Sequence, residues 1–271
     1  MKKFLVIMLS LMMALTMFTA CGQKEETQEE NATLLMGMLT LGNETEEGTN
    51  DRTSDWNIEV KYFDDLNSML LALQSGKIDG MGRMPLSCAK YIVARNDNLE
   101  VYETKDYTIK YSMGVTEDNA QSYDVLNNAI SAMKEDGTLD QLHEEYIDKY
   151  TDGDAEPLAV EMPHFDGANT LKVAVTGDVP PLDLVDSDGN PVGYNVAVLA
   201  EIAKRAKLNI ELIPMNSGSR FTALTSGTVD AVFLVSHTSD EGDGTSDCAK
   251  GVKLIEAFYE DTTAAVMPKG E

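Results

Sequence analysis

The fold of this chain is decided by the stretch LKVAVTGDVPPLDLVDSDGNPVGYNVAVLAEIAKRAKL, residues 171–208. Its first five residues form a β-branched run that predicts a buried strand. The pair Pro180-Pro181 then excludes both helix and strand pairing, and Gly189 provides a turn because it tolerates positive φ. From about Asn195 the apolar residues recur at helical spacing. A strand, a polar loop and a helix form half of a βαβ unit, and ligands of such sheets bind at the carboxyl ends of the strands.

This stretch resembles the opening of the extracellular solute-binding proteins of family 3, the polar amino-acid receptors of ABC importers. The likeness rests on the strand, the Pro-Pro loop, the D-x-D-G turn at 186–189 and the G-[YF]-x-V helix start at 193–196. The resemblance implies a type II periplasmic-binding-protein fold, an α/β architecture of two similar Rossmann-like lobes joined by a hinge. It also implies a small-molecule solute and an ABC permease as partners.

A repeat inside the chain supports two lobes. Residues 69–81 and 220–232 share the pattern A-L-x-S-G-x-[IV]-D, and similar strand segments precede both copies. Asp79 and Asp230 end the two copies, and we assign them to turns and helix starts rather than to a ligand.

The order of the lobes is unusual for the family. Residues 111–150 resemble the family's closing segment, yet they precede its opening at Leu171. We therefore expect a circular permutant, with the lobe that is second in the family at 32–150, a linker at 151–167 and the family's first lobe at 168–271. A fragment of a tandem receptor is the competing interpretation.

The first 31 residues predict export and anchoring. Residues 1–21 have a basic start and an apolar stretch, and they end in FTAC, which resembles a lipobox with lipid on Cys21. The alternatives are an ordinary cleaved signal or a buried N-terminal helix. Residues 22–31 are polar and acidic, which predicts a flexible tether. We expect a monomer held by lipid on the extracytoplasmic face of a bacterial cell membrane.

Composition narrows the functional classes. The 271 residues suffice for two modest cores, and a formal net charge of −25 argues against nucleic-acid binding. Sequence motifs of hydrolases, metalloproteases and P-loop enzymes are missing, so we predict no enzyme, no cofactor and no metal site. Cys88 and Cys248 are interpreted as incidental thiols, with a bridge between them as the alternative.

The local patterns also predict elements outside the opening stretch. Residues 44–55 are acidic and rich in turn formers, whereas 99–102 and 111–115 predict two separate strands. Helices are expected over 123–133 and 139–150, with a break at Gly137.

Candidate ligand-binding residues lie in the loops at the predicted strand ends, where backbone amides are free. They are Thr40, Asn43, Arg83, Asp178, Ser217, Arg220, Ser236 and His237. The resemblance implies a T-x-x-R arginine for an amino-acid carboxylate, but no arginine follows the threonine after Ser236 and His237.

Two of these candidates offer a replacement for the missing arginine. Arg220 and Arg83 are expected to hold a ligand carboxylate, and Asp178 a ligand ammonium. The alternatives are arginines that point to water, a turn-forming Asp178 and a capping or solvated His237.

The sequence therefore predicts a lipid-anchored receptor that delivers an amino acid or a related small polar or anionic metabolite to an ABC permease. The alternatives are a sensor or scaffold lipoprotein without transport and, less favoured, a dehydratase-like enzyme on the same fold.

Overall fold

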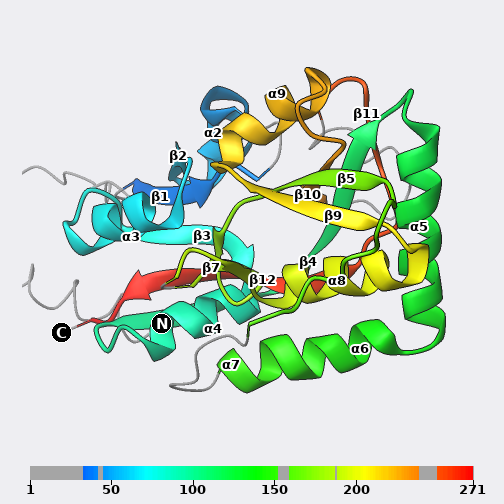
Figure 1. Ribbon diagram of the computed structural model, residues 1–271. Helices are drawn as coiled ribbons and strands as arrows, with labels where there is room; N and C mark the ends of the chain where they lie inside the picture. Colours follow the sequence, from blue (N-terminus) through cyan, green and yellow to red (C-terminus); the bar gives the residue numbers. More distant parts are fainter. Residues whose placement is uncertain (1–32, 42–44, 152–158, 187, 238–248, 271) are drawn as a thin grey trace, which may run out of the picture.

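The computed structural model describes residues 33–41, 45–151, 159–186, 188–237 and 249–270. Within them a mixed sheet of nine strands has the order β2-β1-β3-β12-β4-β10-β5-β9, and β11 pairs with β4. A separate small sheet has the order β6-β7-β8. Helices cover the large sheet, with α4, α6 and α8 below it and α2 and α9 above it in Figure 1. The predicted α/β class is confirmed.

The strands of the large sheet are β1 Leu34–Leu39, β2 Ile58–Phe63, β3 Gly80–Pro85, β4 Leu99–Thr116, β5 Thr170–Val175, β9 Asn209–Pro214, β10 Ala231–His237, β11 Val252–Leu254 and β12 Tyr259–Pro268. Those of the small sheet are β6 Asp178–Val179, β7 Asp183–Val185 and β8 Pro191–Val192. The α-helices are α2 Glu46–Thr53, α3 Leu66–Gln74, α4 Leu86–Ala94, α5 Ala120–Glu135, α6 Thr138–His143, α7 Lys149–Thr151, α8 Tyr194–Ala206 and α9 Arg220–Thr225. Short 3-10 turns cover Ser54–Trp56 and Ser217–Ser219, and Glu144–Asp148 is π-helical.

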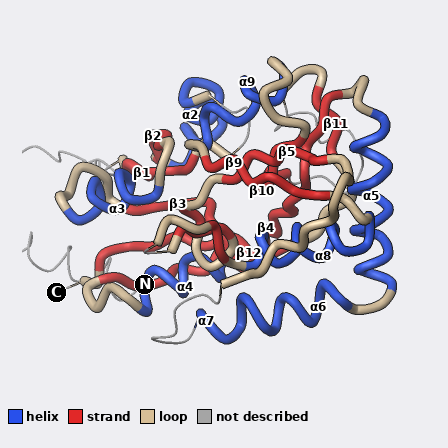
Figure 2. Tube along the Cα trace, in the orientation of Figure 1, coloured by secondary structure: helices blue, strands red, loops and turns tan. Residues whose placement is uncertain are grey.

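Two long strands divide the large sheet into lobes. The first part of β4 pairs with the last part of β12 beside β3, whereas the second part of β4 pairs with β10 and β11. We call β2, β1 and β3 with the adjoining parts of β12 and β4 the β1 lobe. The β5 lobe consists of β9, β5 and β10 with the rest of β4 and β11. Figure 2 shows both long strands running between the lobes.

The two halves of the chain are interwoven in the sheet. Strand β4 begins in the β1 lobe and ends in the β5 lobe, and β12 returns in the opposite direction. Helices α5 and α6 contact α8 of the β5 lobe, and Arg205 of α8 bonds Asp136 at the end of α5. Each half of the chain thus supplies part of both lobes.

The internal repeat is visible in the hydrogen bonds. Asp79 accepts the amide of Leu35 at 2.8 Å, and Asp230 accepts the amide of Lys172 at the same distance in the other lobe. Arg83 and Leu234, four residues after these aspartates, have φ of 53° and 57°. The two aspartates tie the start of a strand to the start of its neighbour, which agrees with their assignment to structural positions.

The opening stretch folds as predicted, with strand β5, a turn at Gly189 with φ of 85°, and helix α8. Two other predictions were wrong. Residues 46–53 form helix α2, and β4 is continuous over 99–116 where two strands were expected. Pairing with β12 carries β4 through the intervening residues.

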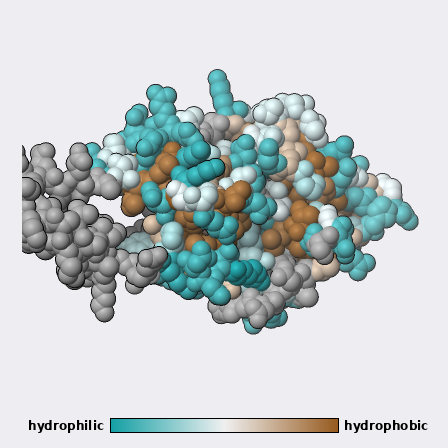
Figure 3. Space-filling model, turned by 90° about the vertical axis from the view of Figure 1, so that its left-hand side faces the viewer, coloured by the Kyte–Doolittle hydropathy of each residue, from teal (hydrophilic) through white to brown (hydrophobic). Residues whose placement is uncertain are grey.

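In Figure 3 hydrophobic residues occur in patches separated by hydrophilic ones, which is usual for a protein surface. Among the described residues, none of the helices has both the length and the apolar character needed to span a bilayer.

Candidate functional site

The carboxyl ends of the parallel strands of both lobes face one another, and residues of both lobes line two small cavities there. The first, of about 20 Å³, has polar lining from Tyr62, Arg83, Tyr111 and Ser236. The second, of about 10 Å³, is mainly apolar, with Leu66, Met69, Val179 and Pro180 among its lining residues. Leu39, Leu41 and Arg83 line both, and we call the two cavities together the interlobe site. Each is about the size of one water molecule, so the lobes are closed upon each other.

Direct hydrogen bonds hold the lobes together beside this site. The amide and the hydroxyl of Ser217 donate to the carbonyl of Asp64, at 3.3 Å and 3.1 Å. Arg220 donates to the carbonyl of Leu41 at 3.1 Å. Because Asp64 and Leu41 belong to the β1 lobe, these bonds stabilise the closed arrangement from within the chain.

Arg220 is fully buried, with 0% exposure. Besides Leu41, its guanidinium donates to the carbonyls of Ser217, Phe233 and Leu234. The side chain thus connects α9 with β10 and with Leu41, two residues after the end of β1. In this closed arrangement the guanidinium is directed at backbone carbonyls, which shows a structural use for a residue expected to bind a carboxylate.

The Pro-Pro loop is positioned by Asp183. This carboxylate accepts the amide and hydroxyl of Thr176, both at 2.9 Å, and the amide of Gly177 at 3.0 Å. Burial raises the pKa of Asp183, and the bonds from Thr176 and Gly177 oppose that rise. The loop therefore presents Val179 and Pro180 to the interlobe site from the end of β5.

The predicted site residues occupy different positions around this site. Arg83 and Ser236 meet at the first cavity, although they are far apart in sequence. Thr40 is half-buried and donates to the carbonyl of Phe63 at 3.1 Å. His237, at the end of β10, forms a 2.9 Å hydrogen bond with the hydroxyl of the buried Ser112.

Other predictions fall outside what is described. Asn43 and Cys21 lie outside the described residues, and of Asp178 only the backbone, in β6, is described. Cys88 is a free buried thiol whose pKa burial raises, whereas Cys248 is not among the described residues. No cluster of potential metal ligands occurs in the described part of the chain.

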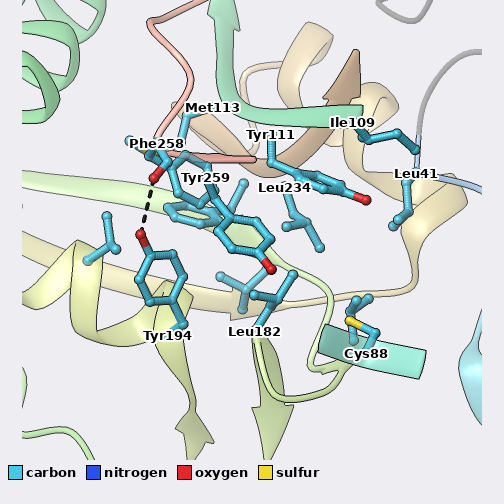
Figure 4. Packing of buried hydrophobic residues seen from close by; sticks show 14 of the residues in the cluster. Leu41, Cys88, Ile109, Tyr111, Met113, Leu182, Tyr194, Leu234, Phe258 and Tyr259 are labelled. Carbon is cyan, nitrogen blue, oxygen red and sulfur yellow. Dashed lines mark hydrogen bonds between the residues drawn. The ribbon is translucent and has the colours of Figure 1, made fainter. Parts of the chain in front are cut away.

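Sequence analysis missed Tyr111, which begins the second part of β4. Its side chain is 0% exposed, and its hydroxyl has no hydrogen-bond partner among the described residues. Figure 4 shows the phenol oxygen directed toward Leu41 and Ile109, two lining residues of the first cavity. Burial raises the pKa of Tyr111 well above its usual value, so the phenol is protonated and able to donate. The sequence signal was only an aromatic residue at the start of a predicted strand.

A larger hollow of about 530 Å³ lies against β4 and β12, lined by residues that include His143, Tyr194 and Tyr259. Both of its buried phenols are satisfied. Tyr194 donates to the carbonyl of Phe258, and Tyr259 bonds Asp261 and Ser87 at 2.7 Å. An unsatisfied buried hydroxyl is thus a feature of the interlobe site and not of this hollow, so we take the interlobe site as the candidate binding site.

Two α/β lobes connected by the two long strands β4 and β12, with a site between their strand ends, are the architecture of the type II periplasmic-binding-protein fold. Residues 171–241 match the model of the bacterial extracellular solute-binding proteins, family 3, which confirms the predicted resemblance in this segment. No curated protein matches the chain.

Several solved structures of transport proteins are similar to the chain. One is a ligand-binding component of an ABC-type import system from Staphylococcus aureus with zinc bound, at 12% identity and a TM-score of 0.44. The match covers 88% of this chain and 66% of that protein, so the chain spans just under two thirds of its length. An ancestral arginine-binding protein bound to arginine has 16% identity and a TM-score of 0.42, with coverage of 89% and 86%. A putative L-cystine ABC transporter from Listeria monocytogenes has 15% identity and a TM-score of 0.40, with coverage of 89% and 84%. Likenesses at this level identify no ligand for the chain.

Proposed function

We propose that the chain is an extracytoplasmic solute receptor of an ABC importer and that it binds an amino acid or a related small polar or anionic metabolite between its lobes. The observation that carries the proposal is the interlobe site, where Arg83 of one lobe and Ser236 of the other line one cavity. Movement of the lobes apart about β4 and β12, the strands that connect them, would enlarge this site. Closure of the lobes around a solute would change the surface that they present to a membrane partner.

The cellular context is part of the same proposal. Lipid on Cys21 would hold the receptor at the outer face of the cell membrane, with residues 22–31 as tether, and an ABC permease would accept the solute. The receptor would act as a monomer.

A permuted lobe order is also proposed. Strand β12 ends beside the start of β3, as the pairing of Val266 with Met81 shows. Strand β1 begins at that same end of the lobe. A short link from residue 268 to residue 33 would therefore restore the family order without crossing the molecule. A chain so linked and reopened within 151–167 should fold cooperatively with the same far-UV circular dichroism. Failure of this rearranged chain to fold, beside a cooperatively folding natural one, would favour a fragment of a tandem receptor.

A sensor or scaffold lipoprotein without transport is the second candidate. The direct bonds from Ser217 and Arg220 to the β1 lobe favour it, because they tie the lobes together through atoms of the chain itself. A ligand has to compete with these bonds, which lowers its apparent affinity.

A thermal-shift screen of the chain from Gly22 onward tests the receptor proposal. Amino acids, dipeptides and small organic acids are the compounds to use, because a ligand that binds the native state raises the melting temperature with its concentration. A selective, concentration-dependent rise supports the receptor. A cooperative melt that no compound moves would favour the sensor or scaffold. Turnover of a bound compound would instead indicate an enzyme.

A further inference from the structure

Tyr111 indicates what kind of group the interlobe site accepts. Its hydroxyl is fully buried and unpaired among the described residues, and it is directed at the first cavity. A buried hydroxyl without a partner is unfavourable, and groups left in that state in a native protein call for an explanation such as a ligand. As a protonated phenol, it offers a hydrogen-bond donor.

Asp261 and Arg83 both act electrostatically on the Tyr111 phenol, and of these two only the cation, Arg83, lines the cavities. Ser236, which is 9% exposed, adds a hydroxyl from the opposite lobe. An arginine with two hydroxyl donors is the arrangement that recognises an oxyanion.

Acidic groups are missing from the described lining of both cavities. Two carboxylates of neighbouring elements, those of Asp261 and the buried Asp183, face other partners. Asp261 accepts the amide of Ser87 and the hydroxyl of Tyr259, at 2.9 Å and 2.7 Å, and Asp183 is occupied by the loop after β5. An ammonium group placed among the described lining residues would therefore meet no counter-charge and would lose its hydration.

The remaining lining is apolar. The second cavity is bounded mainly by aliphatic side chains, Leu39, Leu41, Leu66, Met69, Met84, Ile92 and Val179. It adjoins the first cavity through Arg83 and the two leucines, so a ligand with its anionic end at Tyr111 would place its other end against this surface.

We infer that the interlobe site selects a small organic oxyanion with an apolar body, such as a short-chain carboxylate, and that Tyr111, Arg83 and Ser236 bind its anionic group. This inference rests on the proposed receptor function and narrows its solute class, because it excludes a requirement for an amino group.

Compounds that share one carbon skeleton but differ in their charged groups test the inferred solute class. Leucine carries both charges, 4-methylpentanoate is the same skeleton without the ammonium, and 3-methylbutylamine is the skeleton without the carboxylate. Unbranched carboxylates of two to eight carbons extend the series. In isothermal titration we expect a carboxylate to bind at least about tenfold more tightly than the amino acid of the same skeleton, and the amine not to bind. Tighter binding of leucine, binding of the amine, or no binding of any carboxylate would overturn the inference.

Failure of the inferred solute class and failure of the proposed receptor function give different results. If amino acids or dipeptides bind and carboxylates do not, the solute class is wrong and the receptor function stands. If a cooperatively folded chain binds none of these compounds, the receptor function fails as well.

Tyr111→Phe tests the role of the hydroxyl on the tightest-binding carboxylate. Loss of a donor to a charged group should weaken binding about tenfold or more, while the melting temperature of the unliganded chain stays the same or rises, because an unpaired buried hydroxyl has been removed. Tyr102→Phe is the control, since Tyr102 lies on the same strand and is 66% exposed. A lower melting temperature with unchanged affinity would show that the Tyr111 hydroxyl is structural and would remove it from the site.

Discussion

Replacement of Arg220 by methionine tests whether the buried guanidinium stabilises the fold. Methionine keeps much of the aliphatic stem and removes the donors to four carbonyls, of which those of Ser217 and Leu41 lie outside the strand ladders. The Ser217 carbonyl keeps the backbone amide of residue 220 as a donor, so the Leu41 carbonyl is the group that loses its partner among the described residues, at a cost of about 1–3 kcal/mol. Breaking a buried charged arrangement costs about 3–5 kcal/mol, and Arg220 also favours ionised Asp183. We expect a loss of about 3–5 kcal/mol in the free energy of unfolding.

Urea unfolding followed by circular dichroism measures this loss, with the midpoint moving to lower urea and the slope unchanged. Arg205→Met is the matched control, because Arg205 is 26% exposed and pairs with Asp136 and Glu201 at the surface. We expect the control to lose less than about 1 kcal/mol. A loss below about 1 kcal/mol for Arg220→Met would refute the structural role, and loss of ligand binding with intact stability would return Arg220 to the ligand site.

Two further predictions concern ionisation and closure. Hydrogen bonds from Thr138 and then Arg205 lower the pKa of Asp136 to about 2 from 3.8. A lowered pKa in the folded state stabilises the fold above the unfolded-state pKa, and this contribution is lost as the pH falls toward about 2. Asp136→Asn should therefore melt lower than the natural chain at neutral pH, and the two melting temperatures should converge between pH 3.8 and about 2; a gap that persists there would contradict the assignment. Ser217→Ala removes the hydroxyl bond to the carbonyl of Asp64 and should weaken closure by about 1 kcal/mol. A larger radius of gyration in small-angle X-ray scattering checks this, and an unchanged radius with unchanged ligand affinity would contradict it.

The opening strand, loop and helix were predictable because their signals are local. Gly189 has the positive φ expected of the turn, and the apolar spacing after Asn195 matches α8. The repeat was predictable too, because the same motif builds the same bonds at Asp79 and Asp230.

Helix α2 could not be predicted from its own residues, EEGTNDRT, which form no apolar face. It is held by distant partners instead. Glu46 accepts the amide of Tyr62 at 2.9 Å, and Asn50 accepts the amide of Val60. These bonds satisfy the outer edge of β2, so the helix depends on contacts with this strand that its own residues do not reveal.

The candidate site was predictable only in part, for the same reason. Arg83 and Ser236 were singled out as strand-end residues, and both line the first cavity. Tyr111 was missed because its burial depends on stacking with Tyr259 of β12, at 5.8 Å between ring centroids. Arg220 was expected to face a ligand, because its burial under the carbonyls of β10 and of Leu41 depends on tertiary contacts that the local sequence does not reveal.

The path of β12 has a consequence for synthesis. This strand lies between β3 and β4 in the β1 lobe, yet it is made of residues 259–268, at the end of the chain. A nascent chain therefore lacks this strand of its first-made lobe until residues 259–268 have been synthesised. Residues 33–103 alone would leave β3 and β4 with unpaired edges, which invite association with other chains. Synthesis of the β1 lobe's first strands and completion of that lobe are thus separated in time, because the lobe needs residues 259–268.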